Sequence, residues 1–397
     1  MDLIGWVIFI VALLFSVMLH ETGHFVTAKK FGMKVTRYFV GFGPTIWSTW
    51  RGQTEYGIKA VPAGGFVKIV GMTSLDEVDP EDEPRSFRRH PAWQRIVVLC
   101  AGSFMHFVLA FLLIFGLALG IGIENDNTTQ LGTVTACVAS SSTALANGTC
   151  TKSDQPSPAK LAGLRVGDQV KAFEGRPVSN WTQLGDAIRR ARPGSPVTIT
   201  VLRDGQTLTL HTTLATVSGR SGGYLGIAPA VVFSPANPVR AVQYAGSAFG
   251  QVIVGSVKGI AALPAALTKL FSKDRASTAG GQVVGVVGAA EATGTAVAAN
   301  IGWQFKVSFV LLLIASLNIF VGVFNMLPLL PLDGGHVAVV VWERIRAWFA
   351  RLRGRPDPGL VDMTKLLPVS FSVFAILMLF SVVLILADIV NPVHIAG

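Results

Sequence analysis

Four long apolar runs constrain this chain more than any other feature of its sequence. They cover residues 3–28, 96–123, 305–332 and 366–389, and each is long enough for the roughly 20 residues that a membrane-spanning helix needs. The 397-residue chain is 51% hydrophobic and only 14% charged, which is too apolar for an ordinary soluble protein. The sequence therefore predicts a polytopic α-helical membrane protein with four transmembrane helices.

The first apolar run is expected to stay in the chain as a span. A secretory signal peptide has a basic leading region and a cleavage site of small residues. Here Asp2 precedes the run, and no such site follows it. The expected segments are a first span at 1–30, a β-rich loop at 31–92, a second span at 93–123, an outer domain at 124–230, an amphipathic Gly- and Ala-rich linker at 231–302, a third span at 303–335, a basic loop at 336–365, and a fourth span with an outer tail at 366–397.

Lys and Arg predict the orientation of the chain. They gather in segments 29–95 and 344–365, whereas the tails before residue 3 and after residue 389 contain neither. Short loops rich in Lys and Arg stay on the cytoplasmic side. Both termini and the large segment between spans two and three are therefore expected outside the plasma membrane. The net charge of +10 is explained by contact with anionic lipid of the bilayer, and we expect no nucleic-acid partner.

Two cysteines lie in the large outer segment. An oxidising compartment permits a disulfide between Cys137 and Cys150, although two reduced cysteines in a flexible loop would give the same sequence. The third cysteine, Cys100, lies within the second span and is explained as a small core residue.

The segment His20-Glu21-Thr22-Gly23-His24 lies near the inner end of the first run. Two histidines four apart on a helix project from one face and can share a metal, while the glutamate between them stays free to take a proton from water. The structural alternative is a pair of histidines satisfied by their neighbours. Ionisable groups inside a span are costly and usually functional, which favours a metal site with Glu21 as the catalytic group.

The third span offers a third ligand at the same depth. Spans one and three both run inward, and the third ends in Asn325-Met-Leu-Pro-Leu-Leu-Pro-Leu-Asp333-Gly-Gly-His336. Broken backbone at membrane depth is tolerated only where it is buried in protein or lines a wet cavity. We therefore predict Asp333 as the ligand, against the alternative of an ordinary helix-end aspartate in a Pro-Gly turn. His336 is a rival that lies nearer the basic segment. Three protein ligands leave a position open, as in catalytic zinc sites.

With these motifs on one chain, the sequence resembles the site-2 protease family of intramembrane zinc metalloproteases, in particular its bacterial, PDZ-containing and actinobacterial members. The resemblance covers nearly the whole length and rests on His20-Glu21-x-x-His24, Asn325-x-x-Pro328-x-x-x-Leu332-Asp333-Gly334 and Gly64-Gly65-Phe66-Val67-Lys68. It implies that His20, His24 and Asp333 bind Zn²⁺ and that Glu21 acts as general base and acid. It also implies that Asn325, Gly64, Gly65 and Phe66 contact the substrate.

One position departs from the family pattern. Where relatives commonly have Ala-Gly-Pro and then an asparagine, this chain has Ala101-Gly102-Ser103-Phe104-Met105-His106. A lone intramembrane histidine is more often a satisfied core residue than a ligand. We therefore expect His106 to make a polar contact with the substrate or with span three.

Three further regions bear on the choice of substrate. Residues 35–70 resemble a membrane-associated β-hairpin whose edge can hold a substrate extended, with a plain cytoplasmic cap as the alternative. Residues 131–216, with an Asp204-Gly205 hairpin signal, resemble one PDZ domain that either filters substrates by size or binds peptide ends. Residues 239–270 are expected to form an amphipathic helix on the membrane surface, interrupted by Pro264, with a simple linker to span three as the alternative.

The resemblance implies an endopeptidase of the plasma membrane that cleaves single-span membrane proteins. Anti-sigma factors, similar regulators and remnant signal peptides are the substrates it suggests, each trimmed first on the outside by an upstream site-1-type protease. The alternative is a non-catalytic membrane scaffold that recruits partners through its PDZ domain, but a scaffold would leave Glu21 without a role.

Overall fold

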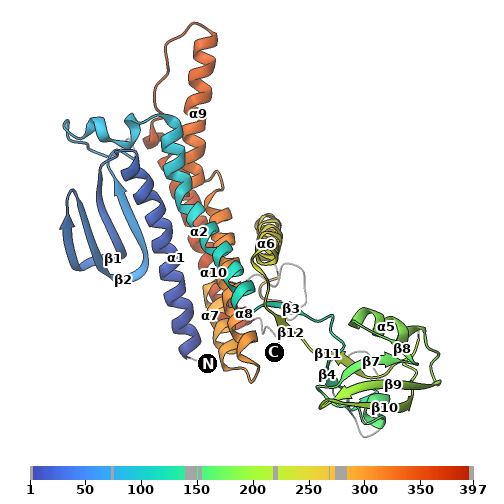
Figure 1. Ribbon diagram of the computed structural model, residues 1–397. Helices are drawn as coiled ribbons and strands as arrows, with labels where there is room; N and C mark the ends of the chain where they lie inside the picture. Colours follow the sequence, from blue (N-terminus) through green and yellow to red (C-terminus); the bar gives the residue numbers. More distant parts are fainter. Residues whose placement is uncertain are drawn as a thin grey trace. The chain divides into compact units, whose positions relative to one another are not determined.

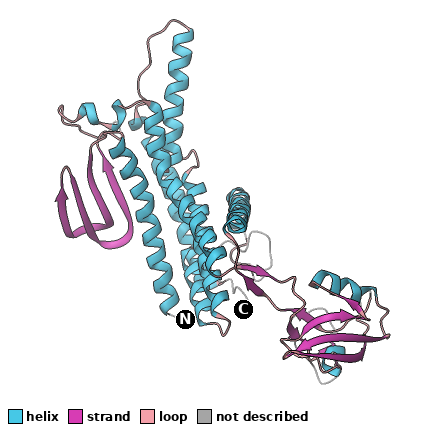
Figure 2. Cartoon of the chain, viewed as in Figure 1, coloured by secondary structure: helices cyan, strands magenta, loops and turns pink. Residues whose placement is uncertain are grey.

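The computed structural model describes residues 3–72, 76–138, 150, 154–217, 222–267, 269–272 and 284–392. The chain divides into two compact units (Figures 1 and 2). The helical unit comprises residues 1–120 and 237–397, and the strand-rich unit comprises residues 121–236.

Five helices of the described residues are long and apolar enough to cross a membrane. They are α1 (Leu3–Lys30), α2 (Ala92–Gly120), α6 (Pro238–Leu267), α8 (Trp303–Asn325) and α10 (Leu367–Val390), the last preceded by the 3-10 turn Met363–Leu366. The chain is therefore a polytopic membrane protein. The expected number of four spans stays a prediction, because α6 meets the same criteria of length and composition.

Helix α6 differs from its expected form in one respect. We expected Pro264 to interrupt it, but the helix continues through Pro264 to Leu267. A proline in a helix removes one backbone hydrogen bond, and the alanines and leucines beside Pro264 are strong helix formers that sustain the last turn. The inner face of α6 packs against α2 and α8 through a cluster of buried residues: Ala110, Ile114, Ala245, Ala315 and Ile319.

Small residues let the helices approach closely. A Cβ on Gly23 of α1 would lie 2.4 Å from the carbonyl oxygen of Ala101 on α2. The short helix α7 (Val286–Ala298) packs against α1, α8 and α10. Asp388 of α10 caps it by accepting hydrogen bonds of 2.8 Å from the backbone N–H groups of Gly285 and Gly288. The bundle thus brings α1, α2 and α8 together around the segment that carries the histidine pair.

The apolar run 305–332 is not one helix. Helix α8 ends at Asn325, a loop with a cis Leu330–Pro331 bond follows, and α9 (Asp333–Leu352) begins at Asp333. Cβ atoms on Gly334 and Gly335 would lie 2.4–2.5 Å from the backbone of this loop. The two glycines therefore allow the loop to fold against the first turn of α9.

A long irregular hairpin joins α1 to α2. It consists of β1 (Val35–Arg51) and β2 (Thr54–Ile69). Residues 37–40 of β1 pair with residues 65–68 on one side and with residues 55–58 on the other. Residues 55–58 also pair with residues 47–50, so the segment 65–68 is the outermost segment at one edge of this sheet and 47–50 at the other. Strand β2 contacts α1. The base of the hairpin is buried, whereas Ile46, Trp47 and Trp50 are exposed.

The strand-rich unit is built on a four-stranded sheet of order β10-β9-β7-β8. The sheet contains β7 (Gln169–Phe173), β8 (Arg176–Pro177), β9 (Pro196–Arg203) and β10 (Gln206–Thr213), and it packs with α4 (Pro158–Leu161) and α5 (Trp181–Arg190) around one apolar core. Asp204 and Gly205 have φ angles of 48° and 81° and form the predicted hairpin turn between Arg203 and Gln206. Six short strands of this unit form three two-stranded pairings, β11-β4, β12-β3 and β5-β6. They are β3 (Ile123–Asn125), β4 (Leu131–Val134), β5 (Cys137–Val138), β6 (Gln155–Pro156), β11 (Ile227–Pro229) and β12 (Val232–Ser234).

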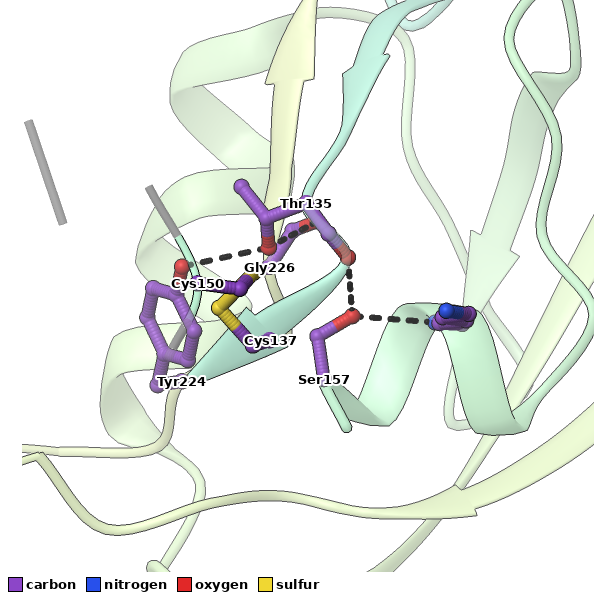
Figure 3. The surroundings of a disulfide bond; sticks show 7 residues. Thr135, Cys137, Cys150, Ser157, Tyr224 and Gly226 are labelled. Atoms are coloured by element: carbon purple, nitrogen blue, oxygen red, sulfur yellow. Dashed lines mark hydrogen bonds between the residues drawn. A yellow bond between two sulfur atoms is a disulfide. The ribbon is translucent and has the colours of Figure 1, made fainter. Parts of the chain in front are cut away.

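A disulfide joins Cys137 of β5 to Cys150, with 5.9 Å between their Cα atoms (Figure 3). Next to it, the Thr135 hydroxyl donates to the carbonyl oxygen of Gly226 at 3.1 Å. The Ser157 hydroxyl donates to the carbonyl oxygen of Thr135. The disulfide therefore lies two residues after Thr135, which is tied to the start of α4 and to the segment before β11.

Candidate active site

Three side chains from two helices converge inside the helical unit. His20 and His24 lie one turn apart on α1, and Asp333 is the first residue of α9. The Nε2 atoms of the two histidines are 3.1 Å apart. Asp333 Oδ2 lies 3.3 Å from His20 Nε2 and 3.4 Å from His24 Nε2. We call this nearly equilateral set the ligand triangle.

The ligand triangle fits a zinc ion. Zinc bonds of about 2.0–2.2 Å at tetrahedral angles place ligand atoms about 3.3–3.6 Å apart, close to the observed 3.1–3.4 Å. Asp333 Oδ2 is buried and has no hydrogen-bond partner among the described residues. A buried carboxylate oxygen without a donor is costly unless a cation neutralises it. Three protein ligands also leave the fourth tetrahedral position for water and substrate.

Helix α2 forms the wall behind the ligand triangle. His24 Nδ1 donates to the carbonyl oxygen of Val98 at 2.7 Å, which leaves Nε2 unprotonated toward the triangle. A Cβ on Gly102 would lie 2.4 Å from His24 Nε2 and 2.5 Å from His20 Cε1. Gly102 is therefore required for α2 to approach the two imidazoles. The role of Gly102 could not be predicted from the sequence, because contacts between helices leave no local pattern.

Glu21 lies between the two histidines on α1, beside the outermost segment of β2. A Cβ on Gly65 would lie 3.5 Å from Glu21 Cγ and 2.6 Å from Met18 Sδ. Farther along α1, Thr22 Oγ1 lies 2.8 Å from the hydroxyl of Tyr38, which ties β1 to the same helix. The hairpin segment Gly64–Phe66 is thus adjacent to Glu21. The Phe66 ring stacks on Phe39, with centroids 5.6 Å apart, and is partly exposed.

Comparison with known proteins groups this chain with zinc metalloproteases. The model of Peptidase family M50 matches residues 8–355. The zinc metalloprotease Rip1 of Mycolicibacterium smegmatis is 39% identical over 99% of this chain and 98% of that protein. Rip1 of Mycobacterium tuberculosis strain H37Rv is 37% identical over 98% of each chain. The putative zinc metalloprotease FN1322 of Fusobacterium nucleatum is 29% identical over 86% of this chain and 88% of that protein.

The chain belongs to peptidase family M50. This finding confirms the resemblance to site-2 proteases and its actinobacterial character, since two of these relatives are actinobacterial. The ligand triangle of this M50 peptidase is also the group of described residues whose donor atoms lie close enough to hold a metal ion.

Two other sequence candidates lie outside the ligand triangle. Asn325 is the last residue of α8, and its amide has no hydrogen-bond partner among the described residues. His336 lies one turn after Asp333 on α9 and lines a separate cavity of about 540 Å³. Arg95 and Glu343 also line this cavity and form a buried ion pair between α2 and α9. The rival ligand His336 therefore faces this ion-pair cavity, whereas Asn325 keeps an amide available at the break after α8.

Proposed function

We propose that this M50 peptidase is a zinc endopeptidase that hydrolyses peptide bonds of single-span membrane proteins within or next to the bilayer. The observation that carries the proposal is the ligand triangle, whose two histidines lie on the apolar helix α1 with Glu21 between them. The enzyme class and the zinc follow from the family, since its relatives are named zinc metalloproteases.

Each residue of the site has a part in the proposed reaction. His20, His24 and Asp333 hold Zn²⁺, which when bound polarises the scissile carbonyl and lowers the pKa of water. Glu21 takes the proton from the attacking water and then delivers it to the leaving amine nitrogen. Asn325 donates from its amide to the substrate backbone.

The hairpin can hold a helical substrate in the extended form that cleavage requires. A peptide bond in a membrane helix has its carbonyl engaged in a helical hydrogen bond, so the segment must be held extended before it is cut. The outermost segment of β2 passes beside Glu21 and offers backbone groups for strand addition. Gly64, Gly65 and Phe66 therefore bind substrate through their backbone.

The proposed topology places the active site toward the cytoplasmic leaflet. Helix α1 ends in Lys29 and Lys30, and α9 carries Arg344, Arg346 and Arg351, as expected of segments at an inner surface. Both termini and the strand-rich unit then lie outside, and four helices span while α6 lies on the membrane surface. The disulfide of the strand-rich unit fits an oxidising compartment.

The strand-rich unit is proposed to be a PDZ domain that limits which substrates reach the membrane. A size filter would admit only substrates whose outer part has been removed by an upstream site-1-type protease. Anti-sigma factors, similar regulators and remnant signal peptides are single-span proteins of this kind. The competing function is a scaffold that recruits partners without cutting them.

Cleavage in liposomes separates these two functions. The purified chain is given a tagged single-span substrate with its outer part removed, before and after zinc is stripped with a chelator. Cleavage that stops on stripping, returns with zinc, and is missing in His24→Ala supports the peptidase. The Glu124→Gln variant, in the strand-rich unit, is the control and should cleave normally. A chain that binds zinc but cuts none of several such substrates would favour the scaffold.

A further inference from the structure

A buried polar cluster joins three membrane helices one turn from the ligand triangle. Its members are Ser16 of α1, His106 of α2 and Asn318 of α8, which are 4%, 3% and 1% exposed. His106 Nδ1 lies 2.8 Å from Asn318 Oδ1 and 3.0 Å from Ser16 Oγ. The Ser16 hydroxyl also donates to Asn318 Oδ1. Because Ser16 precedes His20 by four residues, both side chains lie on the same face of α1.

The hydrogen bonds of Asn318 fix where the proton of His106 sits. Asn318 Nδ2 donates to the carbonyl oxygen of Ile314 at 2.8 Å. The flipped amide would place Oδ1 against that carbonyl oxygen, so Oδ1 must face His106. An amide oxygen only accepts, and therefore His106 Nδ1 carries the proton. In the neutral ring, His106 Nε2 then keeps a lone pair.

The two histidines of the ligand triangle differ at their second nitrogen. His24 Nδ1 donates to the carbonyl oxygen of Val98, whereas His20 Nδ1 is buried without a hydrogen-bond partner among the described residues. A metal-binding histidine almost always donates this N–H, because the bond fixes the ring and raises its basicity. The His106 ring lies against His20, with centroids 5.0 Å apart and planes tilted by 42°.

We propose that His106 is a positioning residue for the zinc ligand His20. Its Nε2 lone pair accepts the N–H of His20 Nδ1 after a small rotation of the rings or through one water molecule, and Ser16 and Asn318 hold His106 in place for this bond. The inference rests on the proposed zinc peptidase and adds the support that its first ligand lacks. It also gives a function to a histidine that stands where related chains commonly have an asparagine.

Three substitutions of His106 distinguish this role from one in which His106 only connects the helices by hydrogen bonds. The Gln side chain places a polar atom near the position of His106 Nε2, and the Asn side chain places one near Nδ1. His106→Gln should therefore keep an acceptor for His20, whereas His106→Asn keeps only the contact with Asn318. His106→Phe removes both and keeps the ring volume. Ser308→Ala, at another buried polar residue of α8, is the control.

The test measures zinc affinity of the full chain in nanodiscs by competition with a chelator. We expect His106→Phe and His106→Asn to bind zinc roughly 10- to 100-fold more weakly, and His106→Gln and Ser308→Ala to stay near wild type. Thermal unfolding of the zinc-free variants shows whether each one folds. In cleavage assays the weak binders should lose kcat more than KM at subsaturating zinc.

The outcomes are distinguishable. If His106→Asn keeps wild-type zinc affinity and His106→Gln loses it, His106 only connects the helices and the inference is overturned. Equal zinc affinity in all variants would also overturn it. If the wild type holds zinc and cleaves its substrate in these cases, the proposed function stands and only the positioning role falls. A wild-type chain that binds no zinc would overturn both.

Discussion

Residue 102 is a glycine, and the imidazoles of His20 and His24 fill the space that a Cβ would occupy there. Gly102→Ala should therefore push α2 away from His20 and His24 and open the ligand triangle. Zinc measured on the purified protein should fall strongly. Gly116→Ala on the same helix is the control, because a Cβ there meets nothing within 4 Å. Full zinc binding by Gly102→Ala would contradict the close packing.

The ion pair of Asp168 with Arg203 ties two parts of the strand-rich unit together, and its contribution to stability depends on pH. Burial raises the pKa of its carboxyl, but hydrogen bonds from Arg203 and from the N–H of Arg165, with the charges of both arginines, outweigh burial and hold the pKa below its usual range. A carboxyl with a lowered folded-state pKa stabilises the fold above its unfolded pKa of about 3.9. This stability is lost as the pH falls through the lower folded-state pKa.

Asp168→Asn tests this tie. The variant keeps one acceptor oxygen but loses the negative charge and one of the two 2.7 Å bonds to Arg203, so the strand-rich unit should be less stable at pH 7 by about 1.5–3 kcal/mol. Below pH 4 the difference from wild type should shrink. Hydrogen exchange of the buried β7 and β9 amides in the full chain measures both effects. A difference that is constant from pH 7 to pH 3 would show that the charge of Asp168 is not involved.

Single residues of the site could be predicted where spacing along one segment carries the chemistry. The i, i+4 histidines with Glu21, and a carboxylate after a Pro-rich break, are patterns of this kind. The roles of Gly102, Ser16 and Asn318 could not be predicted, because they depend on which helices face each other. The polar contact of His106 with span three was expected, but its contact with the ring of His20 was not.

At the scale of elements, the outermost segment of β2 lies beside Glu21, the proposed catalytic carboxylate. A Cβ on Gly65 would lie 2.6 Å from Met18 Sδ and 3.0 Å from the carbonyl oxygen of Phe39. Gly65→Ala should move this segment away from α1 and lower cleavage about tenfold or more, while zinc binding stays unchanged because no metal ligand moves. Gly246→Ala on α6, where a Cβ has open space, is the control. Unchanged cleavage by Gly65→Ala would argue against strand addition at β2.

Composition alone does not decide the structure of two segments. The proline break in the apolar run 305–332 was expected, and the structure adds that the loop after it packs back on Gly334 and Gly335. Helix α6 is the second such segment. Its Gly- and Ala-rich composition gives a mean hydropathy of 1.4, against 2.5 or more for the other long helices. Such a value does not separate a surface helix from a span.

At the scale of the whole molecule, the side on which α6 ends determines the topology. In a background with Cys100→Ser, single cysteines at Ser234 and Lys269 lie before and after α6, and both positions are exposed. Four spans with α6 on the surface predict that an impermeant maleimide labels both positions from outside intact cells. Labelling of position 234 alone would show that α6 crosses the membrane and that the chain has five spans.

Glu21 lies between the two histidines of the ligand triangle on an apolar helix, and the proposed catalysis gives this carboxylate a role. The most direct test compares wild type with Glu21→Gln at equal zinc occupancy, on the same trimmed single-span substrate in liposomes. We expect wild type to cleave and Glu21→Gln to lose cleavage by a factor of 10² or more, on the order of the contribution of a general acid–base. Equal cleavage by the two proteins would contradict the assignment of Glu21 and the mechanism built on it.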